Sequence, residues 1–556
     1  MRRERRARSL HSATCAAMKR RRRRFSSPNY IRREHDASTE YSDPDESGSR
    51  RQSRRALRPR RVRRFGHRSV RAPSDLPTDD TLAERAEASR DWWPLSMHWS
   101  LAGQVPVLAA AVCRPSSTEE ISRLLRWCSD HRVPVTAAGG RSGVCGASVP
   151  LGGGVVLDTT GMQGIVHVDD ESMVVEVLPG TFGPDLEEHL RTHGLTLGHY
   201  PKSFDISTVG GWVACRSAGQ YSTRYGKIEH LVVGLEVVLA DGTLVRTGGS
   251  PAAAQGPDLT QLFVGSEGTL GIITRIWLRA HELPPAERRA AYVIGADGGT
   301  SAAFALGLDT CRRIIRRGAT PAVLRLYDAA ESARGHGGDG TNCMLLVLDE
   351  GDHRIVDATM TIVDDECAAS GAEHAGDEPV ARWMAHRNET GALQALTRKG
   401  FVVDTLEVAA PWSRLTQVVE RTEAALLAVP HARAATCHLS HSYDDGACLY
   451  FTFAATPPPD EFEHTYVSLW DAGQRAALAA GSNLSHHHGI GINRARFMGE
   501  ALGSSWEVLA RIKHALDPRG IMNPGKMGFG PPTAISATSA PQPSPPDVTP
   551  PEHSWP

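Results

Sequence analysis

The sequence predicts an α+β protein whose folded body lies between two polar ends. Three observations support this class. Strand-like and helix-like segments alternate irregularly along the middle of the 556-residue chain, whereas a parallel wound sheet would alternate them evenly. Glycine-rich loops interrupt the first half of this body. The second half instead alternates longer helical stretches with short strands, so we expect two folded domains within a chain of this length.

Both ends of the chain are too polar to bury a core. Residues 1–76 are rich in arginine and serine and are expected to be a disordered basic arm. They would then be a solvated tail or an extended reading frame, with a nucleic-acid or anionic-membrane arm as the alternative. Residues 528–556 repeat proline, serine and threonine and are expected to be a disordered tail. Residues 77–104 lead into the first domain.

The composition argues against several classes of protein. No run of 18 apolar residues occurs, so no membrane span is expected, and no apolar stretch at the start indicates a secretory signal. The ten cysteines are scattered without a CxxC pair, which favours reduced thiols over disulfides or zinc. We expect a cytoplasmic protein with at most peripheral membrane contact, no nucleic-acid partner and a small or lipid-like substrate.

The first domain is predicted over residues 105–281. A capping-box pattern at 116–120 begins a helix whose apolar residues recur at helical spacing. Asp241-Gly242 between two apolar runs indicates a hairpin with a two-residue turn. The predicted strands are residues 133–135, 155–157, 174–177, 235–239, 243–245 and 272–278.

The second domain is predicted over residues 282–527, as an α/β unit. Its predicted helices are residues 303–317 and 412–427, and its predicted strands are residues 344–347, 402–406 and 449–453. A histidine cluster and a terminal helix containing Trp506, Leu509 and Leu516 follow.

Four glycine-rich loops are the strongest functional signal. The loop at 138–146 follows a strand, and its glycines let the backbone approach a ligand and turn several N–H groups toward one point. That arrangement suits a pyrophosphate, although the Rossmann pattern is absent and a structural turn would explain one such loop. Loops at 202–212, 216–219 and 265–274 repeat the pattern, and together the four could wrap an extended dinucleotide.

In this order the four loops resemble the FAD domain shared by vanillyl-alcohol oxidase, D-lactate dehydrogenase and glycolate oxidase. The resemblance covers residues 105–527 and includes the closing segment 517–526. It implies a two-lobed PCMH-type FAD-binding domain, an FAD-linked oxidase C-terminal domain that caps the substrate, and a non-covalent FAD. The residues that it assigns to the cofactor are Ala138, Gly139, Gly140, Arg141, Ser142, Gly143, Val144, Lys202, Ser203, Phe204, Asp205, Ile206, Ser207, Thr208, Cys215, Arg216, Ser217, Ala218, Glu267, Gly268, Thr269, Leu270, Gly271, Ile272 and Ile273.

A narrower resemblance is to alkylglycerone-phosphate synthase. It rests on residues 204–212, 225–229, 443–451 and 484–491. The synthase exchanges the acyl chain of acyl-dihydroxyacetone phosphate for a fatty alcohol, and its FAD does no net redox work. The resemblance implies that Tyr450 moves a proton beside the substrate carbonyl and that His487 or His488, in the triplet with His486, is the base for the alcohol. It also implies that Arg325 binds a substrate anion and that His199 is functional.

Each of these residues has a plainer explanation. Tyr450 could pack in a strand, Arg325 could be a surface charge and His199 a hydrogen-bonded core residue. Three consecutive histidines could hold a metal ion, but neighbours in an extended chain point to opposite faces, so no metal is expected.

Two positions depart from the synthase pattern. Leu393 stands where an ungapped alignment from the strand at 402–407 expects an arginine, and Lys202 stands where the synthase has an acidic residue. A substrate-anion contact would then be missing. The alternatives are an FAD-dependent oxidoreductase of a 2-hydroxy acid or alcohol, similar to D-lactate or glycolate dehydrogenase, and a non-catalytic flavin-binding protein. A homodimer is compatible with either.

Overall fold

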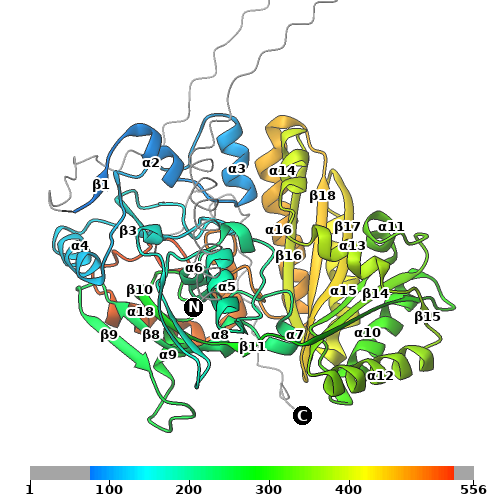
Figure 1. The fold of residues 1–556 in the computed structure, drawn as a ribbon. Helices are drawn as coiled ribbons and strands as arrows, with labels where there is room; N and C mark the ends of the chain where they lie inside the picture. The colour runs from blue at the N-terminus through cyan, green and yellow to red at the C-terminus, as the bar shows by residue number, and fades with distance from the viewer. Residues whose placement is uncertain (1–75, 531–556) are drawn as a thin grey trace, which may run out of the picture. The chain divides into compact units, whose positions relative to one another are not determined.

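A computed structural model describes residues 76–530, without the side chains of residues 392–394. The predictions for the basic arm and the proline-rich tail therefore lie almost entirely outside the described residues. Within them the mixed helix-and-sheet class is confirmed, with sheets of four, five, two and seven strands (Figure 1).

The first sheet forms around a short parallel core. Strand β4 (Val155–Asp158) runs parallel to both β2 (Ala111–Cys113) and β3 (Val135–Ala138), and β1 (Thr78–Asp79) adds an antiparallel edge. Helix α4 (Thr118–His131) connects β2 to β3, and its N-cap is Ser117, whose side chain accepts the N–H of Glu120. The Glu120 carboxylate accepts the N–H of Ser116 in return, so the predicted capping box is confirmed.

The second sheet is antiparallel throughout, in the order β5-β6-β10-β8-β9. Its strands are β5 (Ile165–Asp169), β6 (Val174–Val177), β10 (Ile272–Arg279), β8 (Val232–Val238) and β9 (Leu244–Gly248). The predicted hairpin is confirmed, because β8 and β9 pair, but its turn is longer than the two residues expected. The N–H of Leu239 bonds the carbonyl oxygen of Thr243 across residues 240–242, and Gly242 has a φ of 83°, which glycine adopts without strain. A pair of short strands, β7 (Leu195–Thr196) and β11 (His281–Glu282), lies at the end of this part.

The third sheet has seven strands, in the order β15-β12-β14-β13-β17-β18-β16, and all its pairings are antiparallel. They are β15 (Glu373–His374), β12 (Ala286–Ile294), β14 (Cys343–Gly351), β13 (Val323–Tyr327), β17 (Ala432–Ser442), β18 (Gly446–Ala455) and β16 (Val402–Pro411). The predicted short strands are thus parts of longer ones, and residues 402–406 are the first half of β16.

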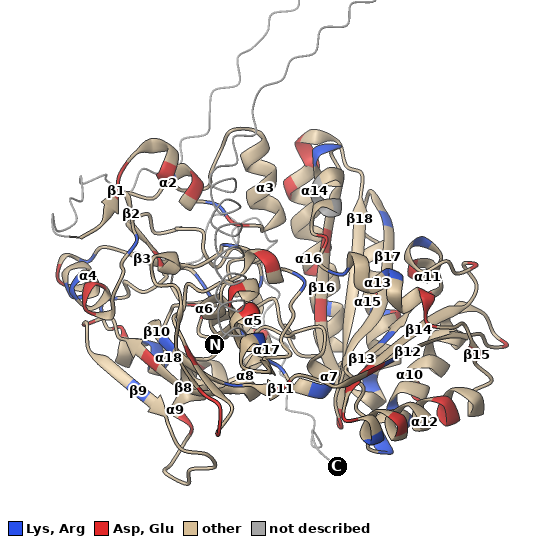
Figure 2. Ribbon diagram, viewed as in Figure 1, with Lys and Arg blue, Asp and Glu red and all other residues tan. Residues whose placement is uncertain are grey.

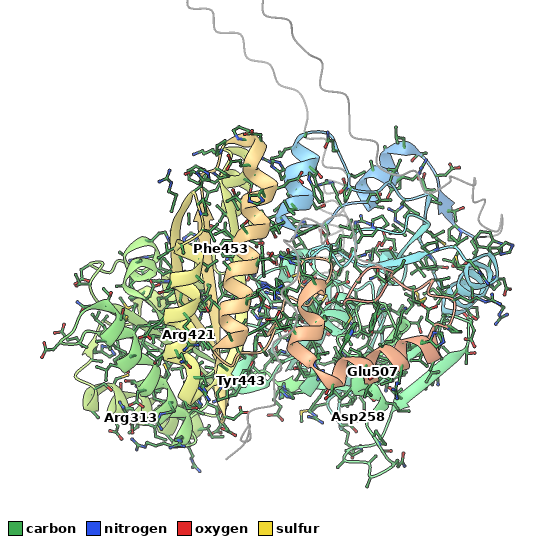
Figure 3. All side chains as sticks on the ribbon, turned by 180° about the vertical axis from the view of Figure 1, so that it is seen from behind. Asp258, Arg313, Arg421, Tyr443, Phe453 and Glu507 are labelled. Carbon is green, nitrogen blue, oxygen red and sulfur yellow. The ribbon has the colours of Figure 1, made fainter. Side chains whose placement is uncertain are left out.

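Helices cover one face of this third sheet. Figure 3 labels Arg313 on α10 (Thr300–Arg316) and Arg421 on α15 (Leu415–Leu427), and α12 (His353–Ala369) and α16 (Phe462–Ala479) complete the layer. Beneath them Leu406, Leu439 and Phe451 are fully buried in one apolar cluster. Burying each such side chain contributes about 1.5–3 kcal/mol to the stability of the fold. This face of the sheet therefore packs the hydrophobic core.

The remaining helices are shorter and connect the sheets. They are α2 (Leu82–Ala88), α3 (Pro94–Leu101), α5 (Gly183–Thr192), α6 (Val209–Cys215), α7 (Ser222–Tyr225), α8 (Ile228–Leu231), α9 (Leu259–Phe263), α11 (Ala329–Gly335), α13 (Glu378–His386), α14 (Gly391–Arg398), α17 (Met498–Leu502) and α18 (Ser504–Leu516). Among the helices of residues 76–530, none combines the length and apolarity that crossing a membrane requires. Charges of both signs lie on outer helices such as α4 and α12 (Figure 2).

Candidate active site

A cavity of about 80 Å³ lies where the first two sheets meet. Small residues line it: Ala137, Ala138, Gly139, Ala147, Ser148, Thr159, Pro179, Gly210, Gly211, Ala214, Cys215, Glu267, Gly268, Gly271, Ile272 and Ile273. A Cβ on Gly139 would lie 2.3 Å from Oγ1 of Thr208, and one on Gly140 would lie 2.2 Å from the carbonyl oxygen of Ile206. The predicted loops therefore touch one another, and their bare backbone leaves the narrow space that an extended dinucleotide needs.

Eight of the residues assigned to the cofactor line this cavity: Ala138, Gly139, Cys215, Glu267, Gly268, Gly271, Ile272 and Ile273. Others hold the loops in place. Arg141 pairs with Asp158 at 3.2 Å, the hydroxyl of Ser207 accepts the indole N–H of Trp212, and Leu270 is buried in the core. The sequence prediction missed the other lining residues, of which the Gly210-Gly211 pair carried a recognisable signal.

The face of the seven-stranded sheet opposite the four helices α10, α12, α15 and α16 carries a row of polar side chains. Tyr327 of β13 lies opposite His438 of β17, His438 opposite Tyr450 of β18, and Tyr450 opposite Glu407 of β16. Because side chains alternate along a strand, Arg325 lies on the same face as Tyr327. Four strands that are distant in sequence thus bring the predicted residues Arg325 and Tyr450 to one surface.

A β-bulge adds a further histidine to this face. The register of β17 against β18 shifts between Leu439 and His441, so that His441 pairs with Cys448. Without the extra residue His441 would point into the apolar layer, because a shift of one residue reverses the face of every side chain. Sequence reasoning did not single out His441, since a bulge leaves no clear pattern in a single sequence.

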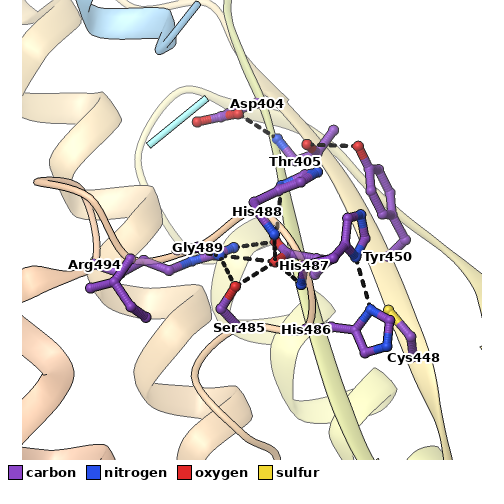
Figure 4. Close-up of polar contacts among 12 residues, drawn as sticks. Asp404, Thr405, Cys448, Tyr450, Ser485, His486, His487, His488, Gly489 and Arg494 are labelled. Carbon is purple, nitrogen blue, oxygen red and sulfur yellow. Dashed lines mark hydrogen bonds and ion pairs between the residues drawn. The ribbon is translucent and has the colours of Figure 1, made fainter. Parts of the chain in front are cut away.

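The histidine triplet lies on a loop that one buried carboxylate organises. Oε1 of Glu407 accepts the backbone N–H of His487 at 3.1 Å, the N–H of His488 at 2.9 Å and the hydroxyl of Ser485 at 2.7 Å. The fully buried guanidinium of Arg494 binds both oxygens of the same carboxylate (Figure 4). This pair holds the pKa of Glu407 well below its usual range despite burial, so the carboxylate stays ionised as the anchor of the loop.

A second buried carboxylate holds the other end of the loop. Glu267, from the loop before β10, accepts the N–H of Ile490 at 2.5 Å and that of Gly491 at 2.7 Å. A Cβ on Gly489 would lie 2.4 Å from Oε1 of Glu267, so only glycine fits there. Glu267 also lines the cavity described above. The loop with the three histidines is therefore fixed to the cavity on one side and to the seven-stranded sheet on the other.

The buried histidines form a hydrogen-bonded chain. Nε2 of His486 bonds the hydroxyl of Tyr443 at 2.6 Å, and its Nδ1 bonds Nδ1 of His487 at 2.9 Å. The hydroxyl of Ser222 bonds Nδ1 of His441 at 2.7 Å. Burial lowers the pKa of His441, His486 and His487 well below the usual value, so all three rings are neutral near pH 7. Tyr443 was noted in the sequence only as part of a motif.

The three neutral rings also come close enough together to hold a metal ion. The ligand atoms of His441, His486 and His487 all lie within 4.8 Å of one another. The sequence expected neighbouring histidines to diverge, and His488 does so, with its Nδ1 3.0 Å from Glu407; His441 from β17 completes the group instead. Several of these nitrogens already have hydrogen-bond partners within the protein.

Tyr450 and Arg325 lie beside this cluster. The hydroxyl of Tyr450 donates to Oγ1 of Thr405 at 3.0 Å, and its ring stacks on His438, with 4.8 Å between centroids, and on His487, at 6.0 Å. Burial raises the pKa of Tyr450, so it is protonated at neutral pH. Arg325 donates to Nε2 of His438 at 2.8 Å, which leaves Nδ1 of His438 to donate to Glu331 at 2.8 Å.

His199 is fully buried and lies apart from the row. Its Nε2 bonds the hydroxyl of Ser217 at 2.9 Å, and its ring packs against that of Trp212. Burial, aided by the charge of Lys227, lowers its pKa to about 3. Leu393 belongs to α14, and its side chain is outside the described part of the chain.

Comparison with known proteins assigns the family. Residues 109–248 match the FAD binding domain and residues 301–527 match the C-terminal domain of FAD linked oxidases. The chain is 32% identical over 472 residues to an uncharacterized FAD-linked oxidoreductase of Escherichia coli K12, covering 81% of this chain and 94% of that protein. The chain belongs to the FAD-linked oxidase family. FAD is therefore its cofactor, and the glycine-lined cavity is a fitting place for it.

Other members of the FAD-linked oxidase family are similar at lower identity. The alkyldihydroxyacetonephosphate synthase of Dictyostelium discoideum is 29% identical, covering 76% of this chain and 74% of that protein. The glycolate oxidase subunit of Bacillus subtilis is also 29% identical, covering 81% and 93%. In fold, a solved alkyldihydroxyacetonephosphate synthase matches with a TM-score of 0.66 at 24% identity, covering 80% of this chain and 82% of that one. A 4-ethylphenol oxidase matches equally well at 18% identity, covering 82% and 94%.

Proposed function

We propose that this member of the FAD-linked oxidase family catalyses a synthase-type exchange, replacing the acyl chain of an acylated ketone phosphate by a fatty alcohol. FAD would be held, without a covalent bond, by residues 105–281, and the substrate would be capped by residues 282–527. The observation that carries the proposal is the row of polar side chains on the sheet face opposite the four helices. It combines a protonated Tyr450, a neutral His487 and the cation Arg325, which are the groups that such an exchange needs.

The proton steps follow from the charge states of these side chains. FAD, held by the glycine-rich loops, would supply an electrophilic ring for the exchange. Tyr450 is neutral at rest and therefore begins as a proton donor, whereas neutral His487 begins as an acceptor. His488 is a weaker candidate for the base, because its Nδ1 lies 3.0 Å from the ionised Glu407. The alcohol would lose its proton to His487 as the new C–O bond forms.

The hydrogen-bonded chain supports this assignment. If Nδ1–H of His487 donates to His486, and Nε2–H of His486 donates to Tyr443, Nε2 of His487 is left as the proton acceptor. The fatty acid leaves as a carboxylate when the ester C–O bond breaks. The reacting carbon keeps its oxidation state, so no electron acceptor is consumed.

A second candidate function is the oxidation of a 2-hydroxy acid or alcohol. Neutral His487 would equally accept the hydroxyl proton of such a substrate, and Arg325 would bind its carboxylate. The similarity to the glycolate oxidase subunit favours this candidate. Electrons would then pass through the flavin to an acceptor outside the chain.

Anaerobic mixing separates the two. We expect the flavin absorbance to persist at equilibrium when the holoenzyme turns over acyl-dihydroxyacetone phosphate and hexadecanol, with ether product detected by mass spectrometry. Stoichiometric bleaching by D-lactate or glycolate, with no ether product, would instead establish the oxidoreductase and end the synthase proposal.

A further inference from the structure

The cap contains a second arginine that faces the same aromatic wall as Arg325. Arg387 follows α13 directly as its C-cap residue. Its guanidinium carbon lies 4.9 Å from the ring centre of Tyr221 and 5.0 Å from that of Tyr200. The ring centre of Trp383, one turn earlier, lies within reach of both guanidinium carbons, at 6.0 Å from Arg387 and 5.5 Å from Arg325.

Polar atoms around Arg387 are buried without a hydrogen-bond partner. They are Nη1 of Arg387 itself, Oε1 of Gln220 and Oδ1 of Asn388. Gln220 touches Arg387 directly, since its Nε2 donates to the Arg387 carbonyl oxygen at 3.2 Å. Leaving a buried donor without a partner destabilises the fold, so a ligand or water that bonds these atoms would be stabilising.

A third cation reaches the same region from the FAD-binding part. Burial and then the charge of Arg325 lower the pKa of Lys202, and the charges of Arg325 and Lys202 both act on His438. Lys202 keeps an accessible surface, so an anion in solution can reach it. Lys202 is thus close to Arg325, two residues after the Tyr200 that Arg387 covers.

No described carboxylate forms an ion pair with any of these three cations. The described acidic residues nearby have other partners. Glu331 bonds His438, which accepts from Arg325, and Glu389 raises the pKa of Lys202 only in part. The charge of Arg387 also acts on Glu350, whose carboxylate accepts the hydroxyl of Tyr225 at 2.6 Å. Cationic side chains that lie close together where water is partly excluded repel one another, and a bound anion reduces that repulsion.

We propose that Lys202, Arg325 and Arg387, with Trp383 against both arginines, form the site that receives the anionic group of the substrate. The inference rests on the proposed function in that the substrate lies under the cap. The anion is a phosphate monoester or a carboxylate. The phosphate is favoured, because it carries about −1.5 to −2 charges near pH 7 against three cations. Arg387 then supplies the contact that Leu393, six residues later, does not.

The test measures binding by calorimetry on the oxidised holoenzyme, with dihydroxyacetone phosphate, glycolate and inorganic phosphate as separate probes. Arg387→Gln and Lys202→Gln should each weaken the preferred probe roughly 10- to 100-fold, as expected for one charge-assisted contact, and Arg387→Lys should recover part of the loss. The matched control is Arg382→Gln on the same helix. Arg382 is paired with Glu378 and 43% exposed, so its replacement should leave binding unchanged.

The outcomes are separable from those for the exchange reaction. Tight glycolate and weak phosphate binding, lost in both variants, would keep the three-cation site and assign it to a carboxylate. Parent-like binding of every probe by folded, FAD-loaded Arg387→Gln and Lys202→Gln would overturn the site even if exchange activity is found. If Arg387→Gln does not fold, probe binding by Lys202→Gln alone decides whether the site exists, because the Lys202 side chain is accessible. Absence of exchange activity with intact probe binding would count against the proposed function only.

Discussion

The Glu407–Arg494 pair allows a quantitative test of how the histidine loop is held. Both side chains are completely buried, and the carboxylate also accepts the N–H groups of His487 and His488. Removing one partner of a buried ion pair costs about 3–5 kcal/mol, because the other charge remains without compensation. We therefore expect Arg494→Met to lower the free energy of unfolding by about 4 kcal/mol. Glu407→Gln should cost about 3 kcal/mol, because the amide oxygen still accepts backbone N–H groups.

The double variant is the informative one. With both charges removed, neither is left uncompensated, so Glu407→Gln with Arg494→Met should cost about 2–3 kcal/mol less than the sum of the single changes. The assay is urea unfolding of the holoenzyme, followed by flavin fluorescence and far-UV circular dichroism. Arg511→Met is the control: its pair with Glu507 is 76% and 71% exposed, and surface pairs contribute about 0–1 kcal/mol.

The same variants test whether Glu407 positions the histidine loop for catalysis. Because Glu407 acts through the loop backbone, Glu407→Gln should lower kcat about 10- to 100-fold with little change in KM or in FAD content. Strictly additive costs in the double variant would refute the coupling on which this reasoning depends. Parent-like kcat in Glu407→Gln would show that the loop keeps its shape without the carboxylate.

Three further predictions follow from the site. Tyr450→Phe should lower turnover on the order of 10²–10⁴-fold while FAD stays bound, if its hydroxyl moves a proton in the transition state; a change within a few fold would return Tyr450 to a packing role. His199 has its pKa depressed to about 3, so the native state stays neutral while the unfolded chain is protonated below pH 6.5. The contribution of neutral His199 to the free energy of unfolding is full above that pH and falls by about 2 kcal/mol at pH 5. His199→Asn should remove this part of the slope of unfolding free energy against pH. An unchanged slope would contradict the burial argument. Acid precipitation of the yellow protein should release free FAD into the supernatant, because Cys145 and Cys215 are thiols whose pKa burial raises; colour that remains with the pellet would show a covalent flavin.

The helix α4, the β8–β9 hairpin and the glycine loops could be predicted from the sequence because their signals are local. The capping box at Ser117, the Asp241-Gly242 turn and the close approach at Gly139 each depend on residues a few positions apart. Local pattern also predicted parts of three strands in the second domain, but not their full lengths, which are decided by pairing with a neighbour rather than by propensity.

The assembly of the site was decided only by the tertiary structure. The row from Tyr327 to Glu407 needs the order of four strands, and a single sequence contains no signal for strand order or for the bulge that turns His441. The placement of Arg387 over Tyr200 and Tyr221 likewise joins residues more than 160 positions apart. A sequence shows which side chains can do chemistry, whereas the distances and the burial that set their charges come from long-range packing.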